Sequence, residues 1–458
     1  MMNKGWVFLS CFLAFLFIFS CSAGFQPGGL IVRWLTDFSH PNDTTDQVRD
    51  FWITSDGGTI GIGRTLNPDT GVWDIWVVKA DVLGNEEWHQ TFGGSQNDEG
   101  IGVFQTSYGD YLLVGNAQSL NMSGKSARNP SVGNWSIWIA LLDDQGEIRW
   151  EAFYGGESED RANAVKPHST QNGFFYVMGS TRSSTGHLEA TPEYGSADAW
   201  AFLGSLDFPG VVHLQGRYGG AADDAFYDLV EENGLIEFFV GVSASDFIPA
   251  TGRFPPASNN FWFVLPNGQS LDAHDGRHYL FGGSDDESFT AGYWEDEGYY
   301  WLGGSTRSRD GDIPTTTHNR LPPTDEDGIL LRFKVRWDTE PSIEWPLRVG
   351  GAGDEKVFGI IPLTQDEWLV GVQSYAQVGS HARRAGQYDN LLIGLTPQGA
   401  VRWNRPFPVE NTLLQAMHGL SQSDDFYVYG DIFPSTSGTD ERSLDDSDWF
   451  LAFTQWVR

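Results

Sequence analysis

Residues 74–94 read DIWVVKADVLGNEEWHQTFGG, and the landmarks of this stretch return along the rest of the chain. Residues 137–156 are a second copy, in which a hydrophobic run containing Trp is followed by a Gly-centred turn and a segment ending in Tyr-Gly-Gly. Landmarks that recur in phase predict a repeat architecture. The first Trp recurs every 62 residues, at Trp76, Trp138, Trp200 and Trp262, and the Gly-Gly pair begins at Gly93, Gly155, Gly219, Gly282 and Gly350.

Each copy reads as four short strands. Bulky residues alternate with polar ones between turns of Gly, Asp and Asn, which is typical of antiparallel strands, and no stretch keeps a helical period. An acidic connection, such as residues 95–99, separates the first two strands of a copy from two more, such as 101–106 and 111–116. Four strands in a fixed period predict a β-propeller blade, and blades stack around an axis because one blade cannot bury both of its faces.

The two ends of the chain complement each other. Residues 448–453 match the first strand of the unit but lack the Gly-Gly strand after it, whereas residues 30–34 match that missing strand. Pairing the two removes two exposed sheet edges. We therefore expect an all-β fold, a seven-bladed β-propeller of four-stranded blades over residues 29–458, closed by the N-terminal strand pairing with the C-terminal blade.

The unit Asp-x-Trp-x-x-Lys-x-Asp-x-x-Gly-x-x-x-Trp-x-x-x-x-Gly-Gly resembles the repeat of bacterial exported propellers, over about residues 29–456. It is distantly similar to the blades of quinoprotein-like propellers. Later copies depart from the pattern, since those at Asp327 and Asp389 lack the first Trp. The resemblance implies an exported propeller but no single activity, because propellers include hydrolases, dehydrogenases and binding scaffolds.

The N-terminal residues have the pattern of an export signal. Lys4 precedes an apolar run from Trp6 to Phe19, which is too short for a comfortable membrane span. Residues 18–21, Ile-Phe-Ser-Cys, resemble a bacterial lipobox. We expect a lipoprotein signal peptide at 1–20, lipidation at Cys21, a short tether at 21–28 and a location in the bacterial cell envelope, periplasmic or at the cell surface. The alternative is a secretory signal cut after Ala23, which would leave a secreted protein.

Composition excludes several classes of protein. Asp and Glu number 61 against 28 Lys and Arg, a net charge of −33, so electrostatic binding to nucleic acid is not expected, and membrane contact is expected through the lipid anchor at Cys21 only. Two cysteines cannot form a disulfide scaffold. The sequence contains no nucleophile elbow, phosphate loop or dinucleotide fingerprint. A function other than catalysis is therefore favoured, and we expect no cofactor.

The acidic connections are candidate metal sites. They should lie where the chain crosses between blades, on the same face as the long loops. A ring of carboxylates could bind Ca²⁺, which takes several oxygens at one centre. Recurrence in every copy favours a structural role instead, with each carboxylate accepting hydrogen bonds from a tight turn. The weak metal candidates are Asp98, Asp160, Asp223, Asp286 and Asp354.

Basic residues gather in the long loops of this acidic chain. They predict a binding surface for an envelope protein or an acidic glycan, or they pair with the acidic connections. We expect a membrane-anchored binding or assembly scaffold. The alternative is a carbohydrate-active hydrolase or a quinoprotein-like enzyme with its site in the central funnel. The candidate ligand-binding residues are Lys125, Arg128, Arg182, Arg307, Arg309, Arg383 and Arg384.

Overall fold

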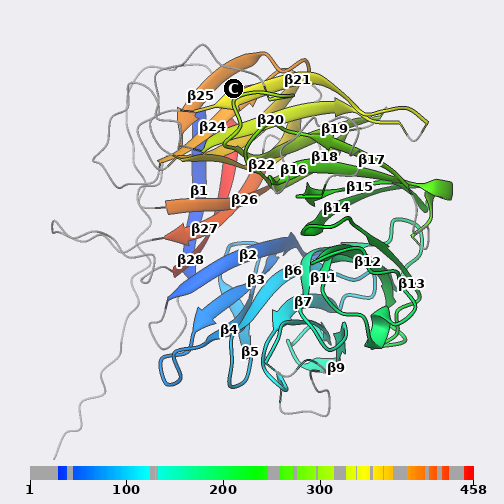
Figure 1. The fold of residues 1–458 in the computed structure, drawn as a ribbon. Helices are drawn as coiled ribbons and strands as arrows, with labels where there is room; N and C mark the ends of the chain where they lie inside the picture. Colours follow the sequence, from blue (N-terminus) through cyan, green and yellow to red (C-terminus); the bar gives the residue numbers. More distant parts are fainter. Residues whose placement is uncertain are drawn as a thin grey trace, which may run out of the picture.

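The structure, a computed structural model, is an all-β propeller of four-stranded blades (Figure 1). It describes residues 29–38, 45–123, 129, 131, 133–245, 258–271, 276–295, 298–313, 326–336, 338–350, 354–364, 366–374, 389–407, 412–419, 425–432 and 448–457. The predicted signal peptide, Cys21 and the tether at 21–28 lie outside the described residues and stay predictions.

The first four sheets follow one another along the chain, each made of four consecutive antiparallel strands. Blade 1 holds β2 (Asp46–Ile53), β3 (Thr59–Leu66), β4 (Trp73–Ala80) and β5 (Glu86–Phe92). Blade 2 holds β6 (Asp98–Gln105), β7 (Tyr111–Ala117), β8 (Ser136–Leu142) and β9 (Ile148–Tyr154). Blade 3 holds β10 (Asp160–Pro167), β11 (Phe174–Thr181), β12 (Asp198–Ser205) and β13 (Leu214–Tyr218). Blade 4 holds β14 (Asp224–Glu232), β15 (Leu235–Ser243), β16 (Asn260–Pro266) and β17 (Gly276–Phe281).

The remaining sheets include the one that joins the two ends of the chain. Blade 5 holds β18 (Glu287–Glu295), β19 (Tyr299–Thr306), β20 (Asp327–Lys334) and β21 (Ser342–Val349). Blade 6 holds β22 (Glu355–Thr364), β23 (Glu367–Ser374), β24 (Asp389–Leu395) and β25 (Val401–Pro406). Blade 7 holds β26 (Thr412–Gly419), β27 (Asp425–Ile432), β28 (Asp448–Val457) and β1 (Gly29–Phe38), in the order β26-β27-β28-β1.

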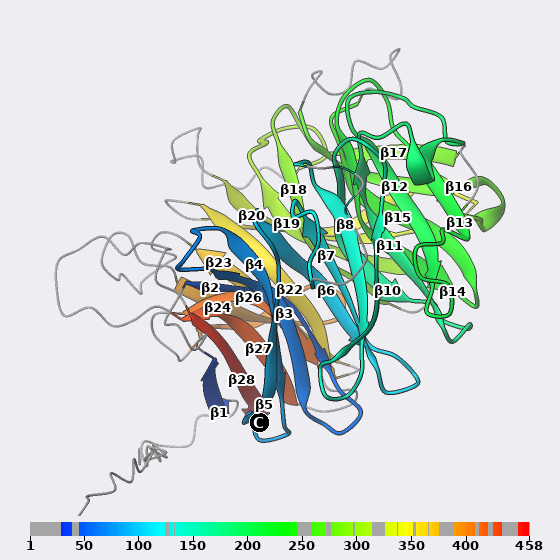
Figure 2. The same cartoon turned by 90° about the horizontal axis from the view of Figure 1, so that it is seen from below.

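The first strand of the chain is the outermost strand of blade 7. β1 pairs antiparallel with β28, with Phe38 opposite Trp449 and Gly29 opposite Val457, and Figure 2 shows the two strands side by side. In every blade the first strand after the acidic connection is innermost, because β2, β6, β10, β14, β18, β22 and β26 all contribute residues to one central cavity. The strand that ends before a Gly-Gly pair is outermost.

The two faces of the propeller differ in their connections. We call the side of the β3–β4 and β7–β8 loops, where the chain also crosses between blades, the long-loop face. The opposite side carries tight turns such as those between β4 and β5 or β6 and β7, and we call it the hairpin-turn face. β28 runs from the long-loop face to the hairpin-turn face, so its partner Gly29 lies at the hairpin-turn face.

The core lies between neighbouring blades. The repeated Trp side chains, from Trp76 to Trp262, are at most 1 % exposed. Trp138 of blade 2 packs in one cluster with Ile75 and Phe92 of blade 1, its ring 5.5 Å from that of Phe92. Each large ring therefore fills the space between two sheets, which holds the blades together through burial of apolar surface.

The expectation of strands and turns alone needs one correction. Two single-turn 3₁₀ helices occur in the connections, η1 (Gly186–Leu188) and η2 (Asn267–Gln269). Leu188 is fully buried in a core cluster of blades 2 and 3, so the long β11–β12 loop folds back onto the blades instead of extending into solvent. In the described part of the chain, no helix is long and apolar enough to cross a membrane.

Candidate functional site

The acidic connections form buried carboxylate sites at the blade junctions. The Asp98 side chain is fully buried. It accepts hydrogen bonds from the backbone N–H groups of Gly94 (3.2 Å), Gln118 (3.0 Å) and Ser119 (3.1 Å), and from the Ser119 hydroxyl (2.7 Å). Burial raises the pKa of Asp98 to about 7 despite these donors. The carboxylate thus links the Gly-Gly turn to the loop after β7.

The same arrangement recurs at other junctions. Asp160 accepts from the Gly156 N–H and the Ser183 hydroxyl, both at 2.8 Å, and also from the Thr181 hydroxyl. Burial raises the pKa of Asp224 to about 6 and that of Glu287 to about 7. The hydroxyl partners were not predicted from the sequence, although Ser/Thr-x-Ser recurs at the end of the second strand in several copies, as at residues 181–183, 243–245 and 306–308. The equivalent buried carboxylates, each the first residue of an innermost strand, are Asp46, Asp98, Asp160, Asp224, Glu287 and Glu355.

The weak metal candidates divide into two groups. Asp98 and Asp160 are buried junction carboxylates, whereas Asp223, Asp286 and Asp354 each lie one residue before a junction carboxylate. Asp286 and Asp354 accept single backbone hydrogen bonds, from Asn259 and Glu326. Over the described residues, no group of three or more His, Cys, Asp or Glu side chains is gathered as metal ligands would be.

The junctions explain why the repeat contains Gly-Gly. A Cβ atom at Gly93 would lie 1.9 Å from the Asp74 carboxylate, and one at Gly94 would lie 2.8 Å from the Ser119 side chain. A Cβ atom at Gly155 would lie 2.2 Å from the carboxylate of Asp160. The first glycine therefore leaves room for a carboxylate, which is Asp74 at Gly93 and Asp160 at Gly155, and the second leaves room for a serine that binds the junction carboxylate.

Two arginines that the sequence analysis did not single out are part of this framework. Arg217 is 1 % exposed, and its Nε and one terminal nitrogen bind the Asp198 carboxylate at 2.7 and 2.6 Å. Its other terminal nitrogen donates to the Ser183 carbonyl. Arg348 binds Asp327 in the same way. Each arginine neutralises the Asp of an Asp-x-Trp or Asp-x-Ile strand.

The described basic residues of the loops are engaged with carboxylates or partly buried. Arg182 pairs with Asp223 at 3.1 Å and lies 3.7 Å from a Glu159 oxygen. Arg307 lies 3.9 Å from Glu326. Arg309 is partly buried. The other candidates, Lys125, Arg128, Arg383 and Arg384, lie outside the described residues.

Ion pairs link four blades across the long-loop face. Arg161 of β10 binds Glu99 of β6 at 3.0 Å and Glu159 at 2.6 Å, and its guanidinium lies 4.2 Å from the ring centre of Trp135. Beside it, a pocket of about 260 Å³ is lined in part by Arg182 and Tyr227. We call this run the ion-pair chain; in order it consists of Arg64, Glu99, Arg161, Glu159, Arg182 and Asp223.

A cavity of about 350 Å³ occupies the centre of the propeller. Every innermost strand contains a β-bulge between its third and fifth residues, so one extra residue faces no partner in the ladder. All these extra residues line the cavity. We call them the bulge ring: Arg49, Ile101, Asn163, Tyr227, Thr290, Phe358 and Gln415.

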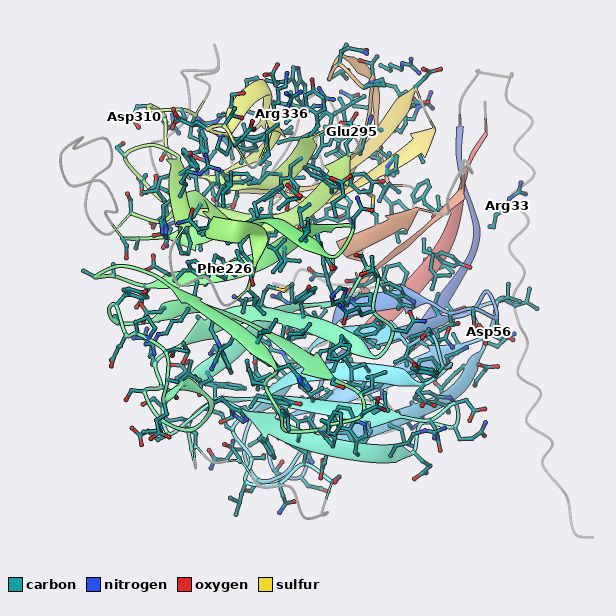
Figure 3. The ribbon with its side chains drawn as sticks, turned by 90° about the vertical axis from the view of Figure 1, so that its right-hand side faces the viewer. Arg33, Asp56, Phe226, Glu295, Asp310 and Arg336 are labelled. Atoms are coloured by element: carbon teal, nitrogen blue, oxygen red, sulfur yellow. The ribbon has the colours of Figure 1, made fainter. Side chains whose placement is uncertain are left out.

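The bulge ring repeats in backbone but not in chemistry. A bulge re-aims one side chain out of the regular alternation of a strand. Here the same irregularity presents two aromatic rings, one cation, two amides, a hydroxyl and an aliphatic group to the axis. The sequence signal for these positions is simple in retrospect, because each follows a buried junction carboxylate or its equivalent by three residues, as Asn163 follows Asp160. In Figure 3, Phe226, next to the bulge of β14, lies near the middle of the molecule, whereas Asp310 lies at its edge.

Two carboxylates that line the cavity, those of Asp228 and Asp50, have hydrogen-bond partners within the protein. Asp228 accepts a hydrogen bond from the Tyr300 hydroxyl at 2.6 Å and pairs with Lys166. Asp50 accepts from the Val103 N–H at 3.1 Å, and burial raises its pKa to about 6.

In the same cavity, Lys356 and Arg49 have no carboxylate within ion-pair distance among the described residues. Both cations remain accessible to water in the cavity. Burial lowers the pKa of Lys356, and the positive charge of Arg49 lowers it further.

No family model matches this chain. The regulatory protein FlaEY of Caulobacter vibrioides is 24 % identical over 384 residues, which is 77 % of this chain, and the chain spans 38 % of that relative's length. A structure of Drosophila Plexin A with Semaphorin 1b aligns with a TM-score of 0.51 at 7 % identity, covering 94 % of this chain and 88 % of that one. The β-propeller domain of the Trilobed protease from Pyrococcus furiosus aligns at 0.42 and 8 %, covering 89 % and 93 %. At these identities the likeness to the solved structures concerns the fold alone.

Proposed function

We propose that the protein is a lipid-anchored binding scaffold of the bacterial cell envelope, which holds a partner protein on its long-loop face around the mouth of the central cavity. The bulge ring carries this proposal. Residues that build the ring of blades recur from copy to copy, whereas the side chains around the axis do not, and recognition requires unlike groups in fixed places. The ion-pair chain adds a run of charged side chains on the long-loop face.

The position of β1 supports an orientation for this scaffold. Gly29 lies at the hairpin-turn face, and the predicted tether from Cys21 reaches at most about 30 Å when extended. A lipid at Cys21 would therefore hold the hairpin-turn face toward the membrane and leave the long-loop face open to a partner. Exposed apolar side chains at the turns of the hairpin-turn face suit this placement, among them Leu83, Tyr108 and Phe208.

The anchor is tested by cell fractionation. We expect Cys21→Ser to move the protein from the membrane fraction to the soluble fraction, because a thiol is required for lipidation. Loss of incorporated labelled palmitate in the same variant should accompany the change. An unchanged membrane fraction, or a wild-type protein that takes up no label, would instead favour the secretory signal cut after Ala23.

The partner is tested by cross-linking the full-length protein in its native envelope, followed by purification and mass spectrometry. Two charge reversals make a matched pair. Arg307→Glu changes the long-loop face at a side chain that is 50 % exposed, and Arg149→Glu changes the hairpin-turn face at one that is 54 % exposed. We expect one recurring partner that Arg307→Glu weakens and Arg149→Glu leaves bound. Recovery of the protein alone at ordinary abundance, or equal loss with both variants, would contradict the proposal.

A further inference from the structure

We propose that the central cavity is an oxyanion-binding site, in which Arg49 and Lys356 together hold a carboxylate or phosphate group of a small ligand. This goes beyond the proposed partner binding on the long-loop face. Arg49 is the bulge residue of β2, and Lys356 is the second residue of β22. Blade 7 lies between their blades, so the two cations approach the axis from one side of the ring.

The two cations line one cavity and form no ion pair among the described residues. Burial lowers the pKa of Lys356, the charge of Arg49 lowers it further, and the charge of Glu326 raises it. The charged groups around them are Asp50 and Glu326. Asp50 directs a carboxylate oxygen to the Val103 N–H, and Glu326 accepts from the Ser305 hydroxyl and lies near Arg307. A protein with a net charge of −33 thus keeps two like charges together in a cavity, an arrangement that an anion would stabilise.

A third cation in the same cavity, Lys166, is paired with a carboxylate, unlike Arg49 and Lys356. Lys166 pairs with Asp228 and donates to the Leu229 carbonyl at 3.1 Å. Its charge is satisfied within the protein, as a partly buried charge normally is. Arg49 and Lys356 lack such a carboxylate among the described residues, so they are the cations in this cavity that remain to bind an anionic ligand.

Neutral hydrogen-bonding groups surround the two cations. Gln373 lies opposite Lys356 in the β22–β23 ladder, and Gln415 is the bulge residue of β26. Both line the cavity together with Tyr227. Amide and phenol groups accept or donate hydrogen bonds to hydroxyls, so the site suits a small hydroxylated acid or phosphate ester better than an apolar one.

The test is calorimetric titration of the full-length protein with three probes: inorganic phosphate, D-glucuronate and the uncharged sugar D-glucose. We expect saturable binding of phosphate, of glucuronate, or of both, and none of glucose; the two anions show which oxyanion the site prefers. Arg49→Met and Lys356→Met should each weaken binding about tenfold to a hundredfold, the effect of one charge-assisted hydrogen bond.

The matched control keeps the cavity charge constant. Lys166→Met combined with Asp228→Asn removes one cation and one anion, so it should leave the affinity within about twofold. Circular dichroism should show that each variant remains folded. The proposal would be overturned if neither phosphate nor glucuronate showed saturable binding up to about 10 mM. It would also be overturned if glucose bound equally well, or if both single variants kept the affinity of the wild type.

Discussion

The blade junctions and the central cavity are built from the same strands, yet the side chains recur from blade to blade at the junctions and differ between blades at the cavity. Asp160 and Asn163 are three residues apart on β10. Asp160 is enclosed by a Gly-Gly turn and two hydroxyls in an arrangement that recurs between blades. Asn163 is a bulge residue on the axis, where every blade differs. The junction arrangement recurs from blade to blade, whereas the side chains around the axis differ between blades.

The largest expected effect comes from filling a junction. Gly155→Ala would place a Cβ atom 2.2 Å from the Asp160 carboxylate, at a backbone φ of +129°. We expect a loss of about 3 kcal/mol or more in the free energy of unfolding, because a buried carboxylate must move or lose its donors. Urea denaturation followed by tryptophan fluorescence measures this.

A glycine on the hairpin-turn face is the control for backbone strain. Gly109 has a φ of +92°, and a Cβ atom there would meet nothing within 4 Å. Gly109→Ala should therefore cost only about 1 kcal/mol, from strain alone. Equal losses for the two variants would mean that crowding at the junction is unimportant.

The second effect tests the buried arginine. Arg217→Met leaves Asp198 buried without its cation, and we expect a loss of about 3–5 kcal/mol. Adding Asp198→Asn should recover most of that loss, since the unpaired charge is then removed. The pair of Arg149, which is 54 % exposed, and Asp110, which is 16 % exposed, provides the contrast, with a change within about 1 kcal/mol for Arg149→Met. A smaller loss at Arg217 than at Arg149 would contradict the assigned role.

The third effect is a dependence on pH. Burial raises the pKa of Asp98 to about 7, above its value in the unfolded chain. The native protein therefore holds a proton that the unfolded chain has released, so the stabilisation is full below about pH 4 and is lost as the pH rises through 7.

We expect Asp98→Asn to flatten the decline in unfolding free energy between about pH 4 and pH 7 relative to the wild type. Asp223→Asn, one residue before a junction carboxylate and 58 % exposed, is the control and should leave the profile unchanged. Parallel wild-type and Asp98→Asn profiles would show that Asp98 titrates normally.

The smallest effect should come from the axis. Arg49→Met and Gln415→Ala change bulge residues in the cavity, and we expect each to alter the free energy of unfolding by about 0.5 kcal/mol or less. Thermal denaturation without added anion measures it. Losses as large as those at the junctions would mean that the bulge ring supports the fold, and the contrast between junction and axis would fail.

Much of the blade could be predicted from the sequence. Trp138 and the turn at Gly155 mark strands because bulky alternation and Gly-rich turns are local properties of the chain. The pairing of residues 30–34 with 448–453 followed from one incomplete copy at each end. Among the weak metal candidates, Asp98 and Asp160 are junction carboxylates, whereas Asp223 lies one residue before the junction carboxylate Asp224. Neighbouring residues of a strand point to opposite sides, so the Asp223 side chain is exposed and that of Asp224 is buried.

The candidate site was harder to predict from the sequence than the blade. Lys125 and Arg383 fall outside the described residues, and Arg182 and Arg307 are near carboxylates that only the fold brings to them. Counting along the sequence could locate the bulge positions, but nothing local indicates that Asn163 leaves the ladder. A bulge is a property of two paired strands and of the twist between them.

The sequence by itself determined the four-stranded unit, its repetition and the join between the two ends, because these depend on spacing along the chain. Only the tertiary structure decided which charges are neutralised. Lys166 and Lys356 look alike in the sequence, yet Lys166 pairs with Asp228, whereas Lys356 lines the same cavity without an ion pair among the described residues. Coulomb interactions depend on distance through space, and the ring of blades brings together at its axis residues from strands that are hundreds of residues apart.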